Sequence, residues 1–196
     1  MRTAEIKRTT AETDIVLKLT LEGKGGAVAP VSVRTGCGFL DHMLTLFAGH
    51  GGFGLTLTCR GDTEVDDHHT VEDVGICLGL ALKQALGDRA GIRRFGSCYV
   101  PMDEALTFTA LDFSNRPYLV FDAPMPQERI GEYDSCLTVE FMRALAMNAG
   151  ITLHQKCFYG ANAHHITEGL FKSLGMAVRD AVKVEGSGVV STKGVL

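Results

Sequence analysis

Hydrophobic and polar residues alternate near the start of the chain in the way that half-buried strands require. Within residues 14–23, one isoleucine and three leucines fall at alternate positions, so we expect a strand with one apolar face. Residues 27–34 are a second strand candidate, and Pro30 favours an edge position for it. The glycine-rich stretch 23–26 is expected to be the turn between them.

Helical periodicity follows in both halves of the chain. From His68 to Leu86, apolar residues recur at intervals of three and four, which predicts a long amphipathic helix. The other expected helices are 39–49, 136–149 and 163–184, and the other expected strands are 54–60, 104–113, 117–123 and 151–158. Residues 123–135, with two prolines, are expected to form a loop, and 186–196 an irregular tail.

The chain contains two copies of one pattern. HHTVEDVGICLGLALKQALG begins at His68, and HHITEGLFKSLGMAVRDAVK begins 96 residues later at His164. Upstream, DHMLTLFAGHGGF matches VEFMRALAMNAGI, which sets His42 opposite Glu140. The order of elements also repeats, so the sequence predicts an α+β fold with an internal tandem duplication. We expect a first half at 1–90 and a second at 91–196, packed together as one compact domain because their junction is short.

Composition and charge argue against several classes of protein, including nucleic-acid-binding, membrane-spanning and secreted proteins. The 196 residues are 45% hydrophobic and 21% charged, as in an ordinary globular protein. A net charge of −4 offers no basic field to nucleic acid. No apolar run reaches the ~20 residues that span a membrane, and the N-terminal sequence lacks the apolar core of a secretory signal. The six cysteines are scattered without a CxxC pair, so we expect a cytoplasmic protein with reduced thiols.

The duplicated His-His-x-x-Glu motif carries the strongest chemical signal. Neighbouring helical positions lie about 100° apart around the axis, so the two histidines diverge and the glutamate falls between them. One copy would be an ordinary solvent-facing helix start, but two copies at equivalent positions favour metal binding. The candidate ligands are His42, His68, His69, Glu72, Glu140, His164, His165 and Glu168.

Eight such ligands suffice for two ions that keep open coordination positions. Imidazole and carboxylate without thiolate suit Mn, Fe, Co, Ni or Zn, and open positions point away from a structural zinc site. The HExxH spacing of metalloproteases is absent. The sequence therefore predicts a metal centre that performs chemistry.

Further candidates are weaker when each is taken alone. Glu12 lies at a strand start, where a carboxylate is more often solvated than catalytic, and Asp103 and Glu104 are its possible echo in the second half. Arg and Lys side chains recognise phosphate, and no GxGxxG or P-loop indicates a nucleotide. The phosphate candidates are Arg94, Arg116, Ser191, Thr192 and Lys193.

The chain resembles the imidazoleglycerol-phosphate dehydratase family of histidine-biosynthesis lyases over essentially its whole length. The motifs that carry the resemblance are GFLDHMLTLFAGHGGF, DDHHTVEDVGICLG, FSNRPY, GANAHHITEGLFKSLG and STKGVL. The resemblance implies a tandem repeat of a βββαβα-type unit, ribosomal protein S5 domain 2-like, in which two sheets pack with helices. It also implies a homo-oligomer, a 24-subunit octahedral shell assembled around manganese, with active sites between neighbouring subunits.

The resemblance further implies residue roles. Two Mn(2+) ions per active site would be held by the eight candidate ligands, and Glu140 stands where relatives often have histidine. The implied catalytic residues are Glu12, as acid/base, with His42, His69 and Glu168. The implied substrate-binding residues are Glu12, His42, His68, Glu72, Arg94, Arg116, His164, Lys172, Ser191, Thr192 and Lys193.

The implied reaction converts D-erythro-imidazole glycerol phosphate to imidazole acetol phosphate and water. The departing C–H is barely acidic, because no carbonyl adjoins it. An imidazole ring bound at an open Mn(II) position can be stabilised as imidazolate, and its electrons can expel the hydroxyl to give a diazafulvene-like intermediate. Glu12 would shuttle a proton.

Two other functions are compatible with the same residues. A dinuclear metal-dependent phosphate-ester hydrolase would use similar ligands, and it predicts release of free phosphate. A metal-storage or shell protein predicts metal binding without turnover.

Overall fold

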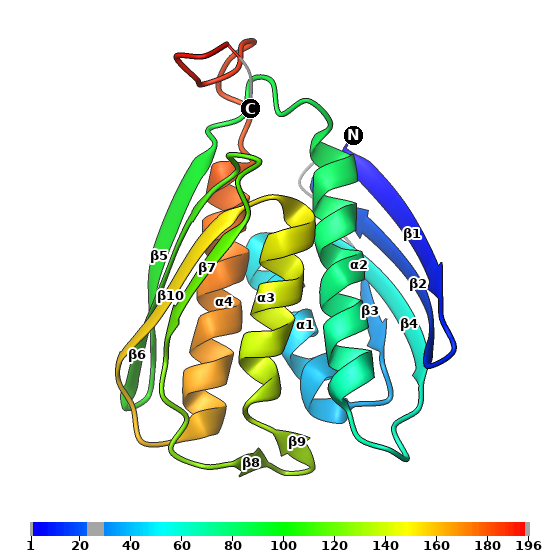
Figure 1. Ribbon diagram of the computed structural model, residues 1–196. Coiled ribbons are helices and arrows are strands. Elements are labelled where there is room, and N and C mark those ends of the chain that lie inside the picture. The colour runs from blue at the N-terminus through cyan, green and yellow to red at the C-terminus, as the bar shows by residue number, and fades with distance from the viewer. Residues whose placement is uncertain (1, 23–29, 195–196) are drawn as a thin grey trace.

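Each half of the chain forms one four-stranded sheet and two helices (Figure 1). The computed structural model describes residues 2–22 and 30–194. The first half contains β1 (Thr3–Thr9), β2 (Thr13–Thr20), β3 (Val31–Arg34), α1 (Gly38–Gly51), β4 (Gly54–Gly61) and α2 (His68–Leu86). The second half contains β5 (Phe95–Met102), β6 (Ala105–Asp112), β7 (Tyr118–Asp122), β8 (Arg129–Ile130), β9 (Tyr133–Asp134), α3 (Leu137–Ala149), β10 (Thr152–Tyr159) and α4 (Ala163–Ala181).

The two large sheets have the same topology. Their strand orders are β1-β2-β4-β3 and β5-β6-β10-β7, so each strand has a counterpart in the other sheet. In both sheets one edge strand runs parallel to its neighbour, β3 beside β4 and β7 beside β10, while the other pairs are antiparallel. The α+β class is confirmed, and the matching order agrees with a duplicated βββαβα unit. The boundary between residues 90 and 91 stays a prediction.

The four helices form a layer between the two sheets (Figure 1). Helices α1 and α2 pack on the first sheet, and α3 and α4 pack on the second. The contacts between helices join the halves, because α1 packs on α4 and α2 packs on α3. All four helices begin at the same end of the molecule, the lower end in Figure 1, and the C-terminal segment lies at the opposite end.

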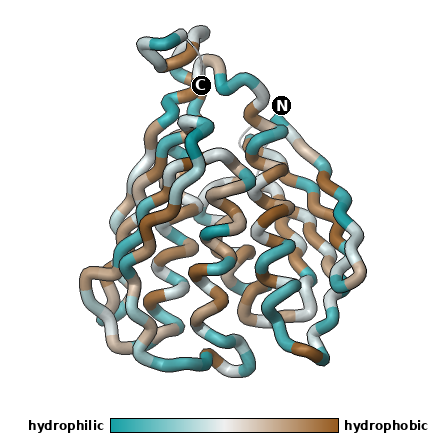
Figure 2. Tube along the Cα trace, viewed as in Figure 1, coloured by the Kyte–Doolittle hydropathy of each residue, from teal (hydrophilic) through white to brown (hydrophobic). Residues whose placement is uncertain are grey.

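The alternation seen in the sequence becomes the buried face of the first sheet. Ile15, Leu17 and Leu19 of β2 are fully buried, whereas Val16 between them is exposed. They join one core that spans both halves and includes Phe47 of α1. Figure 2 shows apolar residues throughout the helical layer and hydrophilic residues concentrated in the loops at the end where the helices begin. None of the helices in the described residues combines the length and hydropathy that a membrane crossing requires.

Two glycines at equivalent positions of the duplication let the helices approach closely. A Cβ at Gly175 of α4 would lie 2.4 Å from the carbonyl oxygen of Phe47 in α1, and a Cβ at Gly79 of α2 would lie 2.7 Å from the carbonyl oxygen of Leu145 in α3. Real side chains essentially never make such contacts with a backbone. Each glycine therefore permits the close approach of a helix that carries a His-His motif to its partner helix from the other half, α2 to α3 and α4 to α1.

Gly175→Ala is expected to lower the thermal unfolding midpoint. The added methyl group must push α1 and α4 apart, and overpacking of this kind costs about 1–3 kcal/mol. Gly49→Ala in α1 is the matched control, because a Cβ there meets nothing within 4 Å and alanine favours the helix. A Gly175→Ala midpoint equal to that of the control would contradict this view of the helix contact.

The sequence pattern missed two strands, β1 and β5. Both are edge strands of their sheets, and each buries only one side chain, Ala4 in β1 and Val100 in β5. Such strands leave little alternation to detect. The expected loop at 123–135 contains the short β8–β9 hairpin. The expected turn at 23–26, and residues 27–29 of the second expected strand, lie outside the described residues.

Candidate active site

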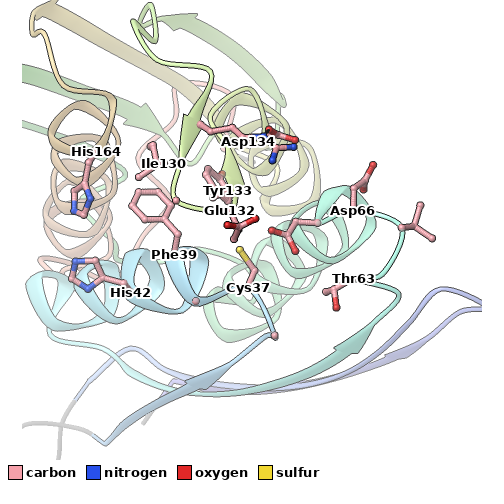
Figure 3. Close-up of a pocket in the computed structure, with 16 residues that line it drawn as sticks. Cys37, Phe39, His42, Thr63, Asp66, Ile130, Glu132, Tyr133, Asp134 and His164 are labelled. Atoms are coloured by element: carbon pink, nitrogen blue, oxygen red, sulfur yellow. Dashed lines mark hydrogen bonds and ion pairs between the residues drawn. The ribbon is translucent and has the colours of Figure 1, made fainter.

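Helices α1 and α4, one from each half, bring together two histidines and a glutamate. Nε2 of His42 and Nε2 of His164 lie 3.3 and 3.2 Å from Oε2 of Glu168. One donor atom from each residue lies within 4.8 Å of the others, which is compact enough to hold one metal ion. Figure 3 shows the two imidazole rings facing each other between the helices. Three candidate ligands from opposite halves of the sequence therefore converge.

Glu168 is the buried member of this cluster. Burial alone would raise the pKa of its carboxyl, but Lys172, His164 and His42 outweigh that effect and leave the pKa below its ordinary value. The Nζ of Lys172 lies 2.6 Å from Oε1. Glu168 is therefore held as a carboxylate, with one oxygen on the lysine and the other facing the two imidazoles.

The equivalent residues of the other helix pair do not converge in the same way. His68 and Glu72 of α2 lie 4.0 Å apart. Glu140 of α3, the counterpart of His42, forms an ion pair with Arg143 on its own helix. The structure therefore brings together one complete triad, and the second set consists of a pair and a separate carboxylate.

The second histidine of the first motif points to the turn between β1 and β2. Nδ1 of His69 lies 3.0 Å from Oδ2 of Asp62, and its Nε2 lies 3.6 Å from Oε1 of Glu12. The hydrogen bond to Asp62 raises the pKa of the His69 imidazole. Glu12 is half-exposed and lies beside the imidazole nitrogen that Asp62 leaves free.

The second histidine of the other motif has a similar environment. Nδ1 of His165 lies 2.6 Å from Oε2 of Glu104, and its Nε2 lies 3.6 Å from Oδ2 of Asp103. The same hydrogen bond raises the pKa of His165 and, together with backbone N–H groups, lowers the pKa of Glu104 to about 2. Both second histidines thus have a carboxylate at each ring nitrogen.

Polar side chains before the two long helices define where the histidine motifs begin. Oδ1 of Asn162 accepts a hydrogen bond of 2.9 Å from the backbone N–H of His164. Oδ1 of Asp66 accepts one of 2.7 Å from the N–H of His68. Such acceptors satisfy backbone donors that have no partner in the first helical turn. The motifs therefore lie at helix starts, as the sequence predicted.

A cavity of about 850 Å³ adjoins the triad. His42 and His164 lie at one side of it, Phe39 and Tyr133 form an apolar wall, and Asp66 lies at the far side (Figure 3). The edge of the His164 ring packs on Phe39 with ring centroids 5.2 Å apart. The triad is thus accessible from a space large enough for a small molecule.

The phosphate candidates gather at the other end of the molecule. Arg94, Arg116 and residues 190–193 line a second cavity of about 540 Å³. The backbone N–H of Arg94 donates to the carbonyl of Ala181, the last residue of α4. Helix α4 has 19 residues and is therefore about 28 Å long. That length separates these candidates from the histidines of the same chain.

The guanidinium of Arg94 already has protein partners. Its Nε and Nη2 lie 2.6 and 3.0 Å from the two carboxylate oxygens of Asp112, and its Nη1 donates to the carbonyl of Val190. The hydrogen bonds to Asp112 raise the pKa of the Arg94 guanidinium above its ordinary value. Arg94 therefore anchors the C-terminal segment, and Arg116, half-exposed at 3.7 Å from the same aspartate, has more freedom to meet an anion.

Sequence reasoning missed the partner carboxylates Asp62 and Asp112. A signal existed for Asp62, because it lies two residues after the expected strand 54–60 and precedes His69 by seven residues. No signal in the sequence pointed to Asp112, which contacts Arg94 only through the pairing of β5 with β6.

Imidazole nitrogens and carboxylate oxygens are the donors in every histidine cluster described above, and no thiolate joins them. This donor set suits Mn, Fe, Co, Ni and Zn. Three protein donors in the triad leave coordination positions for a substrate, water or further side chains. The arrangement is therefore capable of binding a divalent cation and presenting it to a ligand.

Comparisons with known proteins give a consistent family. Residues 35–178 match the family described as imidazoleglycerol-phosphate dehydratase. Curated proteins of that name from Acetivibrio thermocellus and Listeria welshimeri are each 54% identical, over the whole of this chain and 99% and 100% of their own lengths. The structure named for this enzyme from Pyrococcus furiosus has a TM-score of 0.84 at 40% identity, covering 97% of this chain and all of its own. That from Staphylococcus aureus has a TM-score of 0.82 at 36% identity, covering 93% and 99%. The chain belongs to the imidazoleglycerol-phosphate dehydratase family.

Proposed function

We propose that this protein is a hydro-lyase that dehydrates imidazole glycerol phosphate to imidazole acetol phosphate in histidine biosynthesis. The observation that carries the proposal is the convergence of His42, His164 and Glu168, from both halves of a chain in this family, beside an open cavity. The family membership gives no support to the alternative of a phosphate-ester hydrolase.

We propose manganese as the metal, with two ions per active site. His42, His164 and Glu168 would hold one ion, and their nitrogen and oxygen donors lie close enough to share it. The pair His68 and Glu72, with Glu140, would contribute to the second. His69 and His165 would present Nε2 as a ligand. When bound at these ligands, Mn(2+) would supply Lewis-acid chemistry to the imidazole ring of the substrate.

The protein residues then move the protons. Dehydration requires a base that removes a proton from one carbon and an acid that protonates the departing hydroxyl on the next. Glu12 is the candidate for this exchange because its carboxylate is half-exposed and lies 3.6 Å from Nε2 of His69, beside the ligand set. The enol that remains after loss of water tautomerises to the ketone. His42, His69 and Glu168 would orient the ring by holding the metal.

Substrate phosphate would bind at Arg116, Ser191, Thr192 and Lys193, with Arg94 holding the C-terminal segment in place. One small substrate cannot span the length of α4 between these residues and the histidines of the same chain. The two parts of a site would therefore come from different subunits. This separation supports active sites between subunits of a homo-oligomer, for which we propose 24 copies. Six free cysteines support a reducing compartment, and we propose the cytoplasm.

Incubation of the purified protein with imidazole glycerol phosphate and Mn(2+) tests the proposal. We expect an enolisable ketone to accumulate with no inorganic phosphate. Release of inorganic phosphate would favour the hydrolase instead. Manganese binding without any product would favour the metal-storage reading.

A further inference from the structure

The turns that carry Glu12 and Glu104 are counterparts in the duplicated fold. Glu12 immediately precedes β2, Glu104 immediately precedes β6, and these strands occupy the same place in their sheets. Each glutamate also contacts the second histidine of a His-His motif, His69 or His165. Glu12 and Glu104 are therefore equivalent carboxylates of the duplication. Their hydrogen bonds differ.

The carboxylate of Glu104 is fixed by three hydrogen bonds. Its Oε1 accepts from the backbone N–H groups of Ala161 and Asn162 at 3.0 and 2.8 Å, just before α4. Its Oε2 accepts from Nδ1 of His165 at 2.6 Å. Glu12 has only the longer approach to Nε2 of His69, and its carboxylate accepts no hydrogen bond within the described residues. One counterpart is held by three hydrogen bonds, and the other by none among the described residues.

The first half obtains the missing hydrogen bond from another residue. Asp62, which follows β4, lies 3.0 Å from Nδ1 of His69. Among the described residues its carboxylate forms no hydrogen bond or ion pair with any other side chain. Each second histidine thus has a carboxylate at Nδ1, but the two carboxylates come from different elements. A carboxylate that accepts the Nδ1 proton fixes the tautomer in which Nε2 carries a free electron pair.

We propose that Asp62 and Glu104 are positioning residues, which hold His69 and His165 in the tautomer and orientation that offer Nε2 to a metal ion. This inference rests on the proposed manganese site, and it assigns separate roles to the carboxylates around that site. Glu104 positions His165, and Asp62 positions His69, so Glu12 does not have to.

Asp62→Ala and Glu104→Gln test the proposal, because each removes the acceptor of the Nδ1 proton. In Glu104→Gln the amide oxygen can keep both backbone N–H groups, which turns the amide NH2 toward His165. An NH2 group donates, so Nδ1 must become the acceptor and the proton moves to Nε2, which removes the ligand electron pair. Asp62 has no second partner that would orient an amide, and an asparagine oxygen can still accept from Nδ1, so Asp62→Ala is the variant there: it deletes the acceptor at Nδ1 of His69 and leaves the turn before α4 untouched.

Each variant is expected to bind one manganese ion about 10–100-fold more weakly than the wild type, the usual effect of losing such a partner. The measurement is equilibrium dialysis of the manganese-loaded, assembled protein against decreasing Mn(2+), with free Mn(2+) followed by electron paramagnetic resonance. The second ion and the thermal unfolding midpoint are expected to change little. If both variants bind two ions as tightly as the wild type, the proposal is wrong.

Gln127→Leu is the matched control for Glu104. Its Oε1 accepts from the N–H of Ala163 at 2.6 Å and its Nε2 donates to the carbonyl of Ala161, so it anchors the same turn without contacting His165. Equal loss of manganese in Gln127→Leu and Glu104→Gln would reduce Glu104 to an anchor of the turn and overturn its positioning role. If Glu104→Gln does not fold, Asp62→Ala alone decides. A wild-type protein that binds no manganese would instead refute the proposed function.

Discussion

Glu12→Gln is expected to lower kcat by about 10²–10⁴-fold, the contribution of a well-placed acid/base group. The substitution removes the ability to accept a proton but keeps the size and polarity of the side chain. Because Glu12 approaches His69 only at 3.6 Å and carries no hydrogen bond that positions it, the metal ligands should keep their places. Steady-state kinetics measures the loss of kcat, and a manganese titration measures whether metal binding is unchanged.

The matched control for Glu12→Gln is Glu5→Gln in the adjacent strand β1. Glu5 is exposed and pairs only with Lys7, at 3.3 Å, so its loss should leave kcat unchanged. A Glu12→Gln protein with near-normal kcat would remove Glu12 from proton transfer. Loss of manganese in Glu12→Gln would instead make Glu12 a partner of the metal site, and the contrast with Asp62 and Glu104 would fail.

Removal of the metal is expected to reduce turnover to background. A Lewis acid contributes several kcal/mol to the transition state, and each 1.36 kcal/mol is a factor of ten in rate, so the loss should be on the order of 10³-fold. Chelation followed by dialysis creates the test sample, and stoichiometric Mn(2+) should restore turnover. Mg(2+) should restore little, because imidazole donors do not suit it. Full activity in the dialysed protein would end the metal hypothesis.

The duplication made much of the fold predictable. Because residues 68–86 and 163–184 share a pattern and a position in the repeat, they could be assigned to equivalent helices, and the structure has them as α2 and α4. The edge strands β1 and β5 escaped because each buries only one residue, so their pairing with β2 and β6 depends on backbone hydrogen bonds rather than on side-chain pattern.

The site was only partly predictable for a similar reason. The duplication set His42 opposite Glu140 and so nominated it as a ligand, but its approach to His164 and Glu168 depends on α1 packing against α4 across the halves. The duplication made Glu140 equivalent to His42, and the sequence reasoning overlooked Arg143, three residues further along the same expected helix, which forms an ion pair with Glu140. The spacing of residues along a helix shows which side chains share a face. It does not show which of several possible partners a carboxylate binds.

The distance that α4 imposes between the histidine end and the C-terminal cavity has a genetic consequence. Suppose that each site combines the histidine end of one subunit with the C-terminal cavity of another, so that every chain contributes to two sites. A chain with a defect at one end would then disable one of these sites and still complete the other with its intact end. Two defective alleles with lesions at opposite ends would then restore part of the activity when expressed together. One defective allele expressed together with the wild type would inactivate sites in mixed oligomers in proportion to its abundance.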